Sequence, residues 1–428
     1  RPATYTLTLR TVASRTPIPT SRRAVPSTWT WFGRVTPSHS RASAVRVMDA
    51  AATDPSIRAL TARIAEGNVA EFLKFMPGVS VDVTGGHARG VSVNGVPADY
   101  VPVTIDGFSV ASAVGAGGGG GTGRLVAMDM VAINNMSRIE VSFSPTPESE
   151  GSALAGSINL VPRSSFERSR PLFKSSVFLL MRDNAMFLHK SLGPREPTRK
   201  VHPGFDLSYV APVNKRFGFT VSAGNSTQFT PTDFVENEWR GVGAATTAPT
   251  IVNGVITNPG NFPDSTPDKP YLTAFTVRDS GKISRRSSAG TTMDFKVTRN
   301  DTVSLAFQYA FSDKRRSNRT ILYQINQVRP GDFTPTSTRS APGQAQIRME
   351  NEGDGKVGTT WMPTLVWRHD GPVWKSEAGA GYSHSTNIFS DIDKGFFATA
   401  QASRTGVTVA FDDIFYLRPR TITVTDLK

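Results

Sequence analysis

The side chains that most often do chemistry in proteins occur here without the spacing that a reactive site requires. Acidic pairs such as Asp391 with Asp393, or Asp412 with Asp413, lie in sequence typical of loops and strand ends, where solvated carboxylates are expected. The absence of cysteine excludes a thiol nucleophile and a cysteine-based metal site. Six histidines have no metal-ligand spacing to one another or to acids: His39, His87, His189, His202, His369 and His384. The sequence therefore predicts neither an enzyme nor a bound metal or cofactor.

A run of five glycines, Gly117 to Gly121, resembles a loop that cradles phosphate groups. Such loops follow directly from a strand and continue into Gly-Lys-Ser or Gly-Lys-Thr, because the lysine and hydroxyl complete the nucleotide site. Here the run leads instead to Thr122, Gly123 and Arg124, and no strand pattern precedes it. We expect an apical loop at this position and no nucleotide site.

The net charge of +13 is concentrated at the beginning of the chain. Residues 1–65 contain ten arginines, no lysine and two acids, which leaves a charge of only +5 on the other 363 residues. A nucleic-acid surface usually mixes lysine with arginine and interleaves aromatic residues on a folded face. We therefore predict no nucleic-acid binding, and we expect residues 1–65 to be a basic leader that is disordered or is not native sequence.

The composition favours a turn-rich β protein. The 428 residues include 37 glycines and 29 prolines, more breakers than a helical bundle contains. No run approaches the roughly 18 consecutive apolar residues that a membrane-spanning helix needs, whereas a barrel that crosses a membrane with β-strands is not excluded.

Order is expected to start near residue 66 with a short helix. Val69, Phe72, Leu73 and Met76 share one helical face, Asn68 is a plausible N-cap, and Pro77 with Gly78 ends the helix. Short strands separated by strong turns follow, and the glycine run is succeeded by an expected helix over residues 128–136. The expected strands cover residues 79–83, 91–93, 101–105, 137–143 and 156–161, with turns at Asn94-Gly95 and Asp106-Gly107.

This series of signals, in this order and spacing, resembles the plug domain of TonB-dependent outer-membrane receptors. The resemblance covers about 100 residues and rests on segments that are each weak alone. Two departures concern local loop chemistry: Asn94 stands where relatives commonly have arginine, and polar residues 148–150 stand where they often carry an aromatic residue and a glycine. The resemblance implies a plug inside a barrel of 22 strands.

The remaining sequence shows the alternation that a membrane barrel needs. Val303, Leu305, Phe307, Tyr309 and Phe311 share one face of an expected strand, and the opposite face is small or polar. A tight turn at 299–301 joins it to residues 291–297. Further hairpins are expected at 205–221, turned at 214–215, and at 365–382, turned at 370–371, with long polar loops at 241–269 and 329–356.

The predicted fold class is a membrane β-barrel with an N-terminal α+β plug domain. The barrel is expected to be incomplete, because the sequence after the plug supplies about ten antiparallel strands of the 22. A soluble β-sandwich also alternates along its strands, but its strands average five or six residues, whereas residues 302–311 sustain the pattern over about ten. The predicted domains are the leader at 1–65, the plug at 66–165 and the N-terminal part of the barrel at 166–428.

The resemblance implies an outer-membrane receptor, of the Gram-negative type, that takes up a scarce nutrient: a siderophore, a cobalamin or an oligosaccharide. It further implies membrane lipid and a TonB-type energy-coupling protein as partners, the latter pulling on a segment ahead of the plug. The sequence shows no convincing segment of that kind before residue 66. A soluble β-rich binding or adhesion module, and a non-functional receptor remnant, remain alternatives.

Four residues are candidates for function. In the family, an arginine and a glutamate placed like Arg138 and Glu140 face the barrel wall, so these two are expected to hold the plug in place. An exposed charge pair of little energetic value is the alternative. Tyr100 and Arg124 are expected at the extracellular rim, where they would stack on a ligand ring and pair with an anionic group; the alternative for each is an ordinary loop residue.

Overall fold

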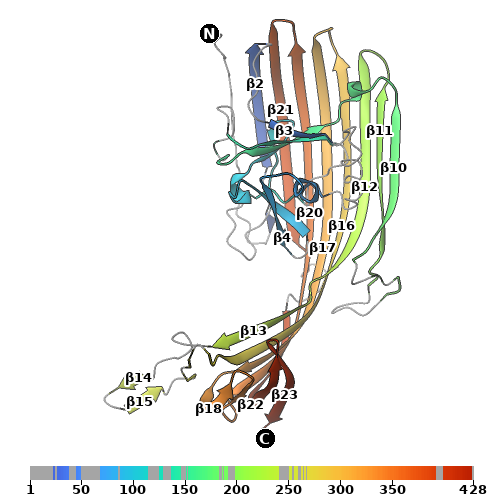
Figure 1. Ribbon diagram of the computed structural model, residues 1–428. Helices are drawn as coiled ribbons and strands as arrows, with labels where there is room; N and C mark the ends of the chain where they lie inside the picture. Colours follow the sequence, from blue (N-terminus) through green and yellow to red (C-terminus); the bar gives the residue numbers. More distant parts are fainter. Residues whose placement is uncertain are drawn as a thin grey trace.

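The computed structural model of the chain consists of a curved antiparallel sheet, a small domain on its inner side and a second group of strands at one end (Figure 1). It describes residues 23–24, 27–37, 45–49, 68–84, 87–113, 125–128, 136–145, 151, 153–182, 186, 188–190, 198–240, 250–252, 255–258, 262–263, 265–266, 268–391 and 399–426. Of residues 23–49, 84, 87 and 250–258 only the backbone is described. Every helix among these residues is too short or too polar to cross a membrane.

The small domain, residues 68–162, has the predicted order of elements, and we call it the plug segment. Helix α2 (Val69–Leu73) begins at Asn68, whose side chain accepts a hydrogen bond of 3.0 Å from the Ala70 amide, as an N-cap should. The elements that follow are β4 (Val79–Thr84), β5 (His87–Val93), the 3-10 turn η1 (Ala98–Tyr100), β6 (Val103–Ile105), β7 (Phe108–Ser109), β8 (Met136–Ser142) and β9 (Ser157–Pro162). The helix expected at 128–136 lies largely outside the described residues, as does the glycine run.

A single apolar cluster fills the plug segment. It contains the predicted helical stripe and the predicted inward residues of the strands, all of them buried. Two wall residues, Met362 and Val366, belong to the same cluster. The plug core therefore continues into the wall on which the plug segment lies. Its members include Val69, Phe72, Leu73, Met76, Val91, Val93, Ile105, Ile139, Val141 and Ile158.

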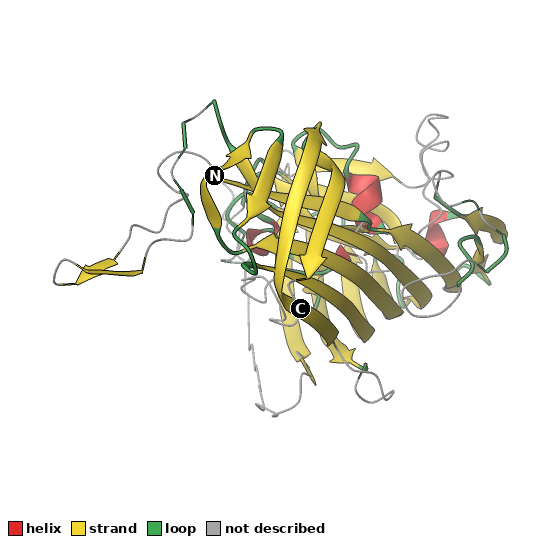
Figure 2. Cartoon of the chain, turned by 90° about the horizontal axis from the view of Figure 1, so that it is seen from below, coloured by secondary structure: helices red, strands yellow, loops and turns green. Residues whose placement is uncertain are grey.

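The wall consists of long antiparallel strands joined by tight turns, which confirms the predicted hairpins. The turns lie at 213–216, 297–300 and 371–373, at the end of the sheet drawn at the top of Figure 1. Seen from below, the strands lie side by side in a curved row (Figure 2). The wall strands are β10 (Leu172–Leu180), β11 (His202–Pro212), β12 (Phe217–Pro231), β16 (Tyr271–Lys296), β17 (Asp301–Ile325), β20 (Ala345–Asp370) and β21 (Trp374–Phe389), with η3 (Ser165–Glu167) linking plug and wall.

The two faces of the wall differ as predicted. Register aligns Phe219, Met293, Leu305 and Leu365 in one outward row, while Ala306 and Gln308 face inward and are buried. The outward apolar residues of β17 run from Val303 to Phe311, nine residues or about 27 Å along the strand. That length matches the apolar band of a membrane barrel, about 25 Å.

Beyond this band, β16, β17 and β20 continue into a second group of strands with its own core. Residues 329–356 were expected to be a loop, and that prediction was wrong: they form β18 (Val328–Thr334), β19 (Ser337–Ser340) and the first part of β20. The polar composition misled the prediction because cross-strand pairing, not local propensity, orders these residues. The other strands here are β13 (Phe234–Arg240), β22 (Thr399–Phe415) and β23 (Arg418–Asp426), with the separate hairpin β14 (Thr250–Val252) and β15 (Val255–Asn258).

The described parts of residues 1–65 form three strands. β1 (Arg23–Ala24) and β2 (Ser27–Pro37) pair with the edge of β21, and β3 (Val45–Asp49) pairs antiparallel with β8 of the plug segment. Among the described strands β10 forms the other edge of the wall, so the sheet is not closed. The domain boundaries at 65 and 165 stay predictions.

Candidate functional site: the contact between plug and wall

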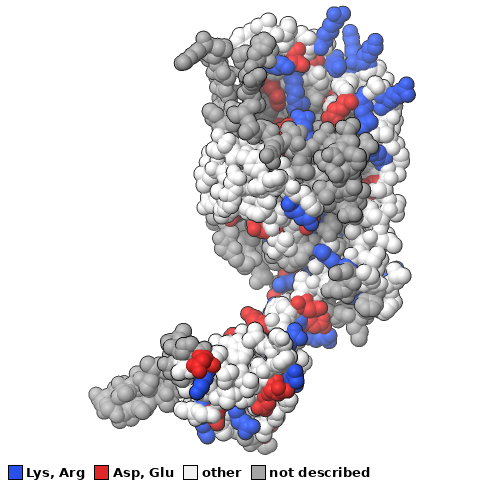
Figure 3. Space-filling model, in the orientation of Figure 1, with Lys and Arg blue, Asp and Glu red and all other residues white. Residues whose placement is uncertain are grey.

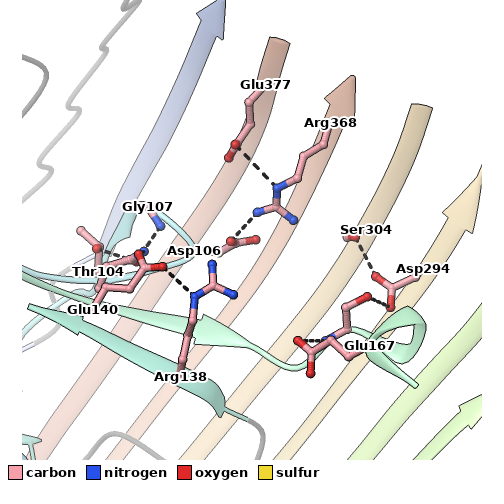
Figure 4. A network of polar contacts seen from close by, with 12 residues as sticks. Thr104, Asp106, Gly107, Arg138, Glu140, Glu167, Asp294, Ser304, Arg368 and Glu377 are labelled. Carbon is pink, nitrogen blue, oxygen red and sulfur yellow. Dashed lines mark hydrogen bonds and ion pairs between the residues drawn. The ribbon is translucent and has the colours of Figure 1, made fainter. Parts of the chain in front are cut away.

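The turn between β6 and β7 makes the charged contact between the plug segment and the wall. Asp106 and Gly107 both have positive φ, 52° and 83°, a hairpin-turn geometry that glycine and aspartate tolerate. The turn points Asp106 at the wall, where its Oδ1 lies 2.5 Å from Nη2 of Arg368 on β20 (Figure 4). Nε of Arg368 lies 3.6 Å from Oε2 of Glu377 on β21. One wall cation therefore joins a plug acid to a wall acid.

Phe108, immediately after this turn, fits against two glycines of β21. Its side chain is fully buried. A Cβ at Gly381 would lie 2.7 Å from two atoms of the Phe108 ring, and one at Gly379 would lie 2.8 Å from its Cζ. The absence of side chains at these two inward positions creates the depression that the ring occupies.

A second anchor holds the segment that leaves the plug. Asp294 of β16 is fully buried, and its Oδ2 accepts hydrogen bonds from Ser164 Oγ (3.0 Å), Ser165 N (2.6 Å) and Ser165 Oγ (2.8 Å). Its other oxygen accepts a bond of 2.7 Å from Ser304 on β17 (Figure 4). The four hydrogen bonds that this buried carboxylate accepts compensate for its loss of contact with water. Asp294 therefore fixes the exit of the plug to the turn end of the wall.

Arg138 and Glu140 lie on one face of β8, as predicted, and pair with each other. Arg138 Nε lies 2.7 Å from Glu140 Oε1, and Asn159 of β9 donates a 3.0 Å bond to Glu140 Oε2 (Figure 4). Asn159 in turn accepts bonds from Thr104 and from the Gly107 amide. Within the described part of the chain the pair thus supports the strand and turn that carry Asp106. Its role as a direct contact with the wall stays a prediction.

The two candidate ligand residues are not brought together by described structure. Tyr100 ends the 3-10 turn η1 and is half-buried; its amide donates to Pro97 O and its carbonyl accepts from Leu154 N. Arg124 lies outside the described residues. Both assignments stay predictions.

The inner wall beyond the apolar band is rich in charge. Arg316 Nη2 lies 2.9 Å from Glu352 Oε1 and 3.1 Å from Asp354 Oδ2. One step nearer the plug, Lys314 of β17 stands opposite Lys356 of β20. Lys314 and Lys356 thus place two cations on neighbouring strands at this level of the wall. Among the described residues no group of three or more histidines and acids is arranged to hold a metal ion.

Two features of the site were missed from the sequence, and only the second has a signal in it. The turn at Asp106-Gly107 was predicted, but nothing local shows that its acid meets Arg368, 262 residues later. Glycines two apart in a strand, such as Gly379 and Gly381, mark one face as free of side chains and signal a close approach by another element.

Comparison with known families identifies the domain that makes these contacts. Residues 46–157 match the model of the TonB-dependent Receptor Plug Domain. The match begins within β3, the strand that pairs with β8. No curated protein sequence matches the chain significantly.

Solved structures of receptors and a transporter match the chain at low identity and low TM-score. A variant of the ferric enterobactin receptor PfeA of Pseudomonas aeruginosa, in complex with enterobactin, matches at 10% identity and a TM-score of 0.39, covering 90% of this chain and 59% of that one. The unliganded ferric citrate transporter FecA matches at 12% and 0.32, covering 90% and 58%. The siderophore receptor PirA of Pseudomonas aeruginosa matches at 13% and 0.30, covering 87% and 59%.

The chain thus spans about three fifths of the length of these structures. The family match, the order of the plug elements and the amphipathic wall agree with one another. Residues 46–157 are a plug domain of the TonB-dependent receptors, joined in this chain to the antiparallel wall of a barrel that is not closed among the described strands.

Proposed function

We propose that the chain acts as an outer-membrane receptor for active uptake of a scarce nutrient, with a TonB-type protein supplying the work that moves the plug. The observation that carries this proposal is the seating of the plug segment on the inner face of the wall. Phe108 and the Asp106 to Arg368 contact hold one edge, and Asp294 holds the exit. A plug held by a few specific contacts keeps a pore closed until force is applied.

The free-energy cost of displacing the plug favours energy-coupled uptake over passive diffusion. The plug core extends to Met362 and Val366 of β20, so its displacement exposes apolar surface and breaks buried hydrogen bonds. These costs make spontaneous opening rare. Because an outer membrane has no energy source of its own, work delivered from elsewhere is required to open such a plug.

The proposed ligand is bound between the plug and the far end of the wall. We propose Tyr100 and Arg124 as its contacts on the plug, and the cations Lys314 and Lys356 as a surface that attracts anionic groups from the wall. Siderophores, cobalamins and oligosaccharides all contain groups that an aromatic ring and cations can hold. We also propose that Arg138 and Glu140 stabilise the seated plug.

Transport is tested by nutrient-dependent growth of a strain that lacks its own receptor for each candidate nutrient and expresses this chain. Growth on one nutrient, lost when the energy-coupling protein is deleted, is the expected result. Tyr100→Ala and Arg124→Ala should lower uptake and affinity together. Unchanged uptake and affinity would remove these residues from the site while leaving the receptor assignment intact.

The alternatives predict different behaviour of the purified chain. A receptor whose wall spans a membrane is expected to show heat-modifiable migration in a detergent gel and to insert into lipid vesicles. A soluble binding or adhesion module is expected to show neither behaviour. A receptor remnant fails to insert and also fails to support growth. Insertion without growth on any candidate nutrient would contradict the transport proposal alone.

A further inference from the structure

Basic residues are concentrated at the end of the wall that carries the tight turns, on the side of strands β10 to β17. Six exposed basic residues lie in the linker after the plug and in or directly beside the first two turns; we call them the turn-end cations. Figure 3 shows lysine and arginine side chains concentrated at this end, drawn at the top. The turn-end cations are Arg168, Arg170, Lys215, Arg216, Lys296 and Arg299.

Sheet register brings the three segments that carry these cations side by side. The amide of Lys296 donates a 2.7 Å bond to the carbonyl of Arg216, which links the two turns directly. On the other side, Leu172 stands opposite Val210, so the linker that precedes β10 runs beside the β11 to β12 turn. Neighbouring strands lie about 4.8 Å apart, which gathers the six charges within the width of four strands.

None of the six turn-end cations has an acidic partner among the described residues, unlike Lys375 beside the adjoining turn. Lys296 lies 4.7 Å from the centre of the Phe166 ring, and the others make no ion pair. Three acids close to them in sequence already have hydrogen-bond donors: Asp294 accepts from the serines of the linker, Glu167 from the Ser164 amide, and Asp301 from Thr298 and His369. At the next turn, by contrast, Lys375 pairs with Asp370 at 2.7 Å.

The outward row of side chains next to these turns is apolar and largely aromatic. Register aligns Phe217, Phe295, Val303 and Trp367 across four strands. The rings of Phe217 and Phe295 are 4.8 Å apart, and Phe295 is 43% exposed. Such a row is typical of the level at which a membrane barrel passes from hydrocarbon to headgroups.

We propose that the turn-end cations bind the headgroups of anionic phospholipid, with phosphatidylglycerol as the representative, in the leaflet that contacts the short turns. This inference rests on the proposed location in a membrane. Unpaired cations directly beside an exposed aromatic row match a molecule that is anionic at one end and apolar at the other. Free phosphate matches only the first property, and an acidic soluble protein would leave the aromatic row uncovered.

The test compares lipid preference of the purified full chain and two variants in neutral detergent. Bound lipid is counted by native mass spectrometry during titration with phosphatidylglycerol or with phosphatidylcholine of the same acyl chains. One variant combines Lys215→Gln, Arg216→Gln and Arg299→Gln. The matched control is Lys375→Gln, which removes one cation that already has an acidic partner.

The unchanged chain and the control are expected to prefer phosphatidylglycerol, and the triple variant to lose at least about tenfold of that preference, since each exposed cation near an anionic surface contributes roughly fivefold to binding. An unchanged preference in the triple variant, or an equal loss in the control, would overturn the proposal. Displacement of the lipid by millimolar inorganic phosphate would do the same, because it would assign the cations to phosphate alone.

A separate measurement keeps this proposal distinct from the proposed function. All three proteins are mixed with vesicles of pure phosphatidylcholine, and insertion is followed by heat-modifiable migration. Insertion of all three, with loss of lipid preference in the triple variant only, supports both ideas. Failure of the unchanged chain to insert would contradict the membrane location, whereas insertion without any lipid preference would contradict this inference alone.

Discussion

At the scale of single residues, the contact between Phe108 and Gly381 shows how a missing side chain positions a domain. The ring is fully buried, and a Cβ at Gly381 would lie 2.7 Å from its Cγ and Cδ1, too close to be accommodated by a small rotation. These atoms are near the Phe108 backbone, so relief requires movement of the β6 to β7 hairpin. The two positions should therefore be energetically coupled.

We predict that Phe108→Ala lowers the free energy of unfolding by about 3–5 kcal/mol through the cavity it leaves. Gly381→Ala should cost about 1–3 kcal/mol by overpacking, but clearly less when Phe108→Ala is also present, because the ring it would strike is gone. Urea unfolding in detergent of the unchanged chain, the two single variants and the double variant measures the coupling energy between the two positions. Gly151→Ala, at a site with nothing within 4 Å, is the control; additive losses would contradict the coupling.

Asp301 provides a prediction about pH at the turn between β16 and β17, outside the apolar band. Hydrogen bonds from the side chains of Thr298 and then His369 lower the pKa of Asp301 below its ordinary value of 3.8, and Trp367 contributes a further bond. A carboxylate whose pKa is lower in the folded state stabilises that state above the unfolded pKa. The contribution disappears as the pH falls through the lowered folded pKa.

Asp301→Asn should therefore lower the urea midpoint at pH 7, and the difference from the unchanged chain should shrink as the pH is taken below 3.8. The same titration with Asp370→Asn, a carboxylate on the exposed surface of the next turn, serves for comparison. A difference that grows in acid would show that the charged form of Asp301 is not the one stabilised by these bonds.

At the scale of elements, the linker η3 works as the fixed end of the plug. The Ser164 side chain caps it, the Ser164 amide donates a reciprocal bond to the Glu167 carboxylate, and Ser164 and Ser165 both donate to Asp294. The helical turn is too short to be stable alone. Its order therefore depends on the buried carboxylate of the wall.

Asp294→Ala should destabilise this junction by about 3 kcal/mol, because three donors from the linker lose a charged acceptor. Proteolysis is expected to become faster within residues 163–171 while the wall strands stay protected. Ser304→Ala, which removes a donor of the wall to the other oxygen of Asp294, should leave cleavage unchanged. Equal cleavage in both variants would indicate general loosening of β16 instead.

The elements that could be predicted from the sequence are those with local causes. The helix at Val69 has its cap and apolar stripe within nine residues, and the hairpins have their turn residues beside their alternation. The plug contact could not be predicted, because Asp106 meets Arg368 only through the tertiary fold. Residues 329–356 look like a loop, and their order comes from pairing with β17, β19 and β22.

At the scale of the whole molecule, the described structure has two separate cores connected by strands. The plug cluster includes Met362 and Val366 of β20, and the distal cluster includes Ala345 of the same strand. Met362 and Ala345 are 17 residues apart, about 56 Å along an extended strand. The distal cluster contains Tyr271, Leu272, Phe275, Ile325, Val328, Ala345, Val407, Val409, Phe411 and Ile414.

Clusters that share no residue and are this far apart should lose their structure in separate steps. Phe411→Ala removes a fully buried ring from the distal cluster, and Phe72→Ala removes one from the plug cluster. Each change is expected to cost about 3–5 kcal/mol within its own cluster. Hydrogen exchange should therefore speed up in β22 and β23 for the first variant, and in α2, β8 and β9 for the second.

The strands β16, β17 and β20 provide the decisive readout, because they pass through both regions. Their amides beside the plug segment should keep their protection in Phe411→Ala, while those beside β22 should lose it. Faster exchange along the whole length of β20 in either variant would show that the wall transmits the loss, and the chain would then behave as one cooperative unit. In the expected case the distal strands lose their structure while the plug segment keeps its own.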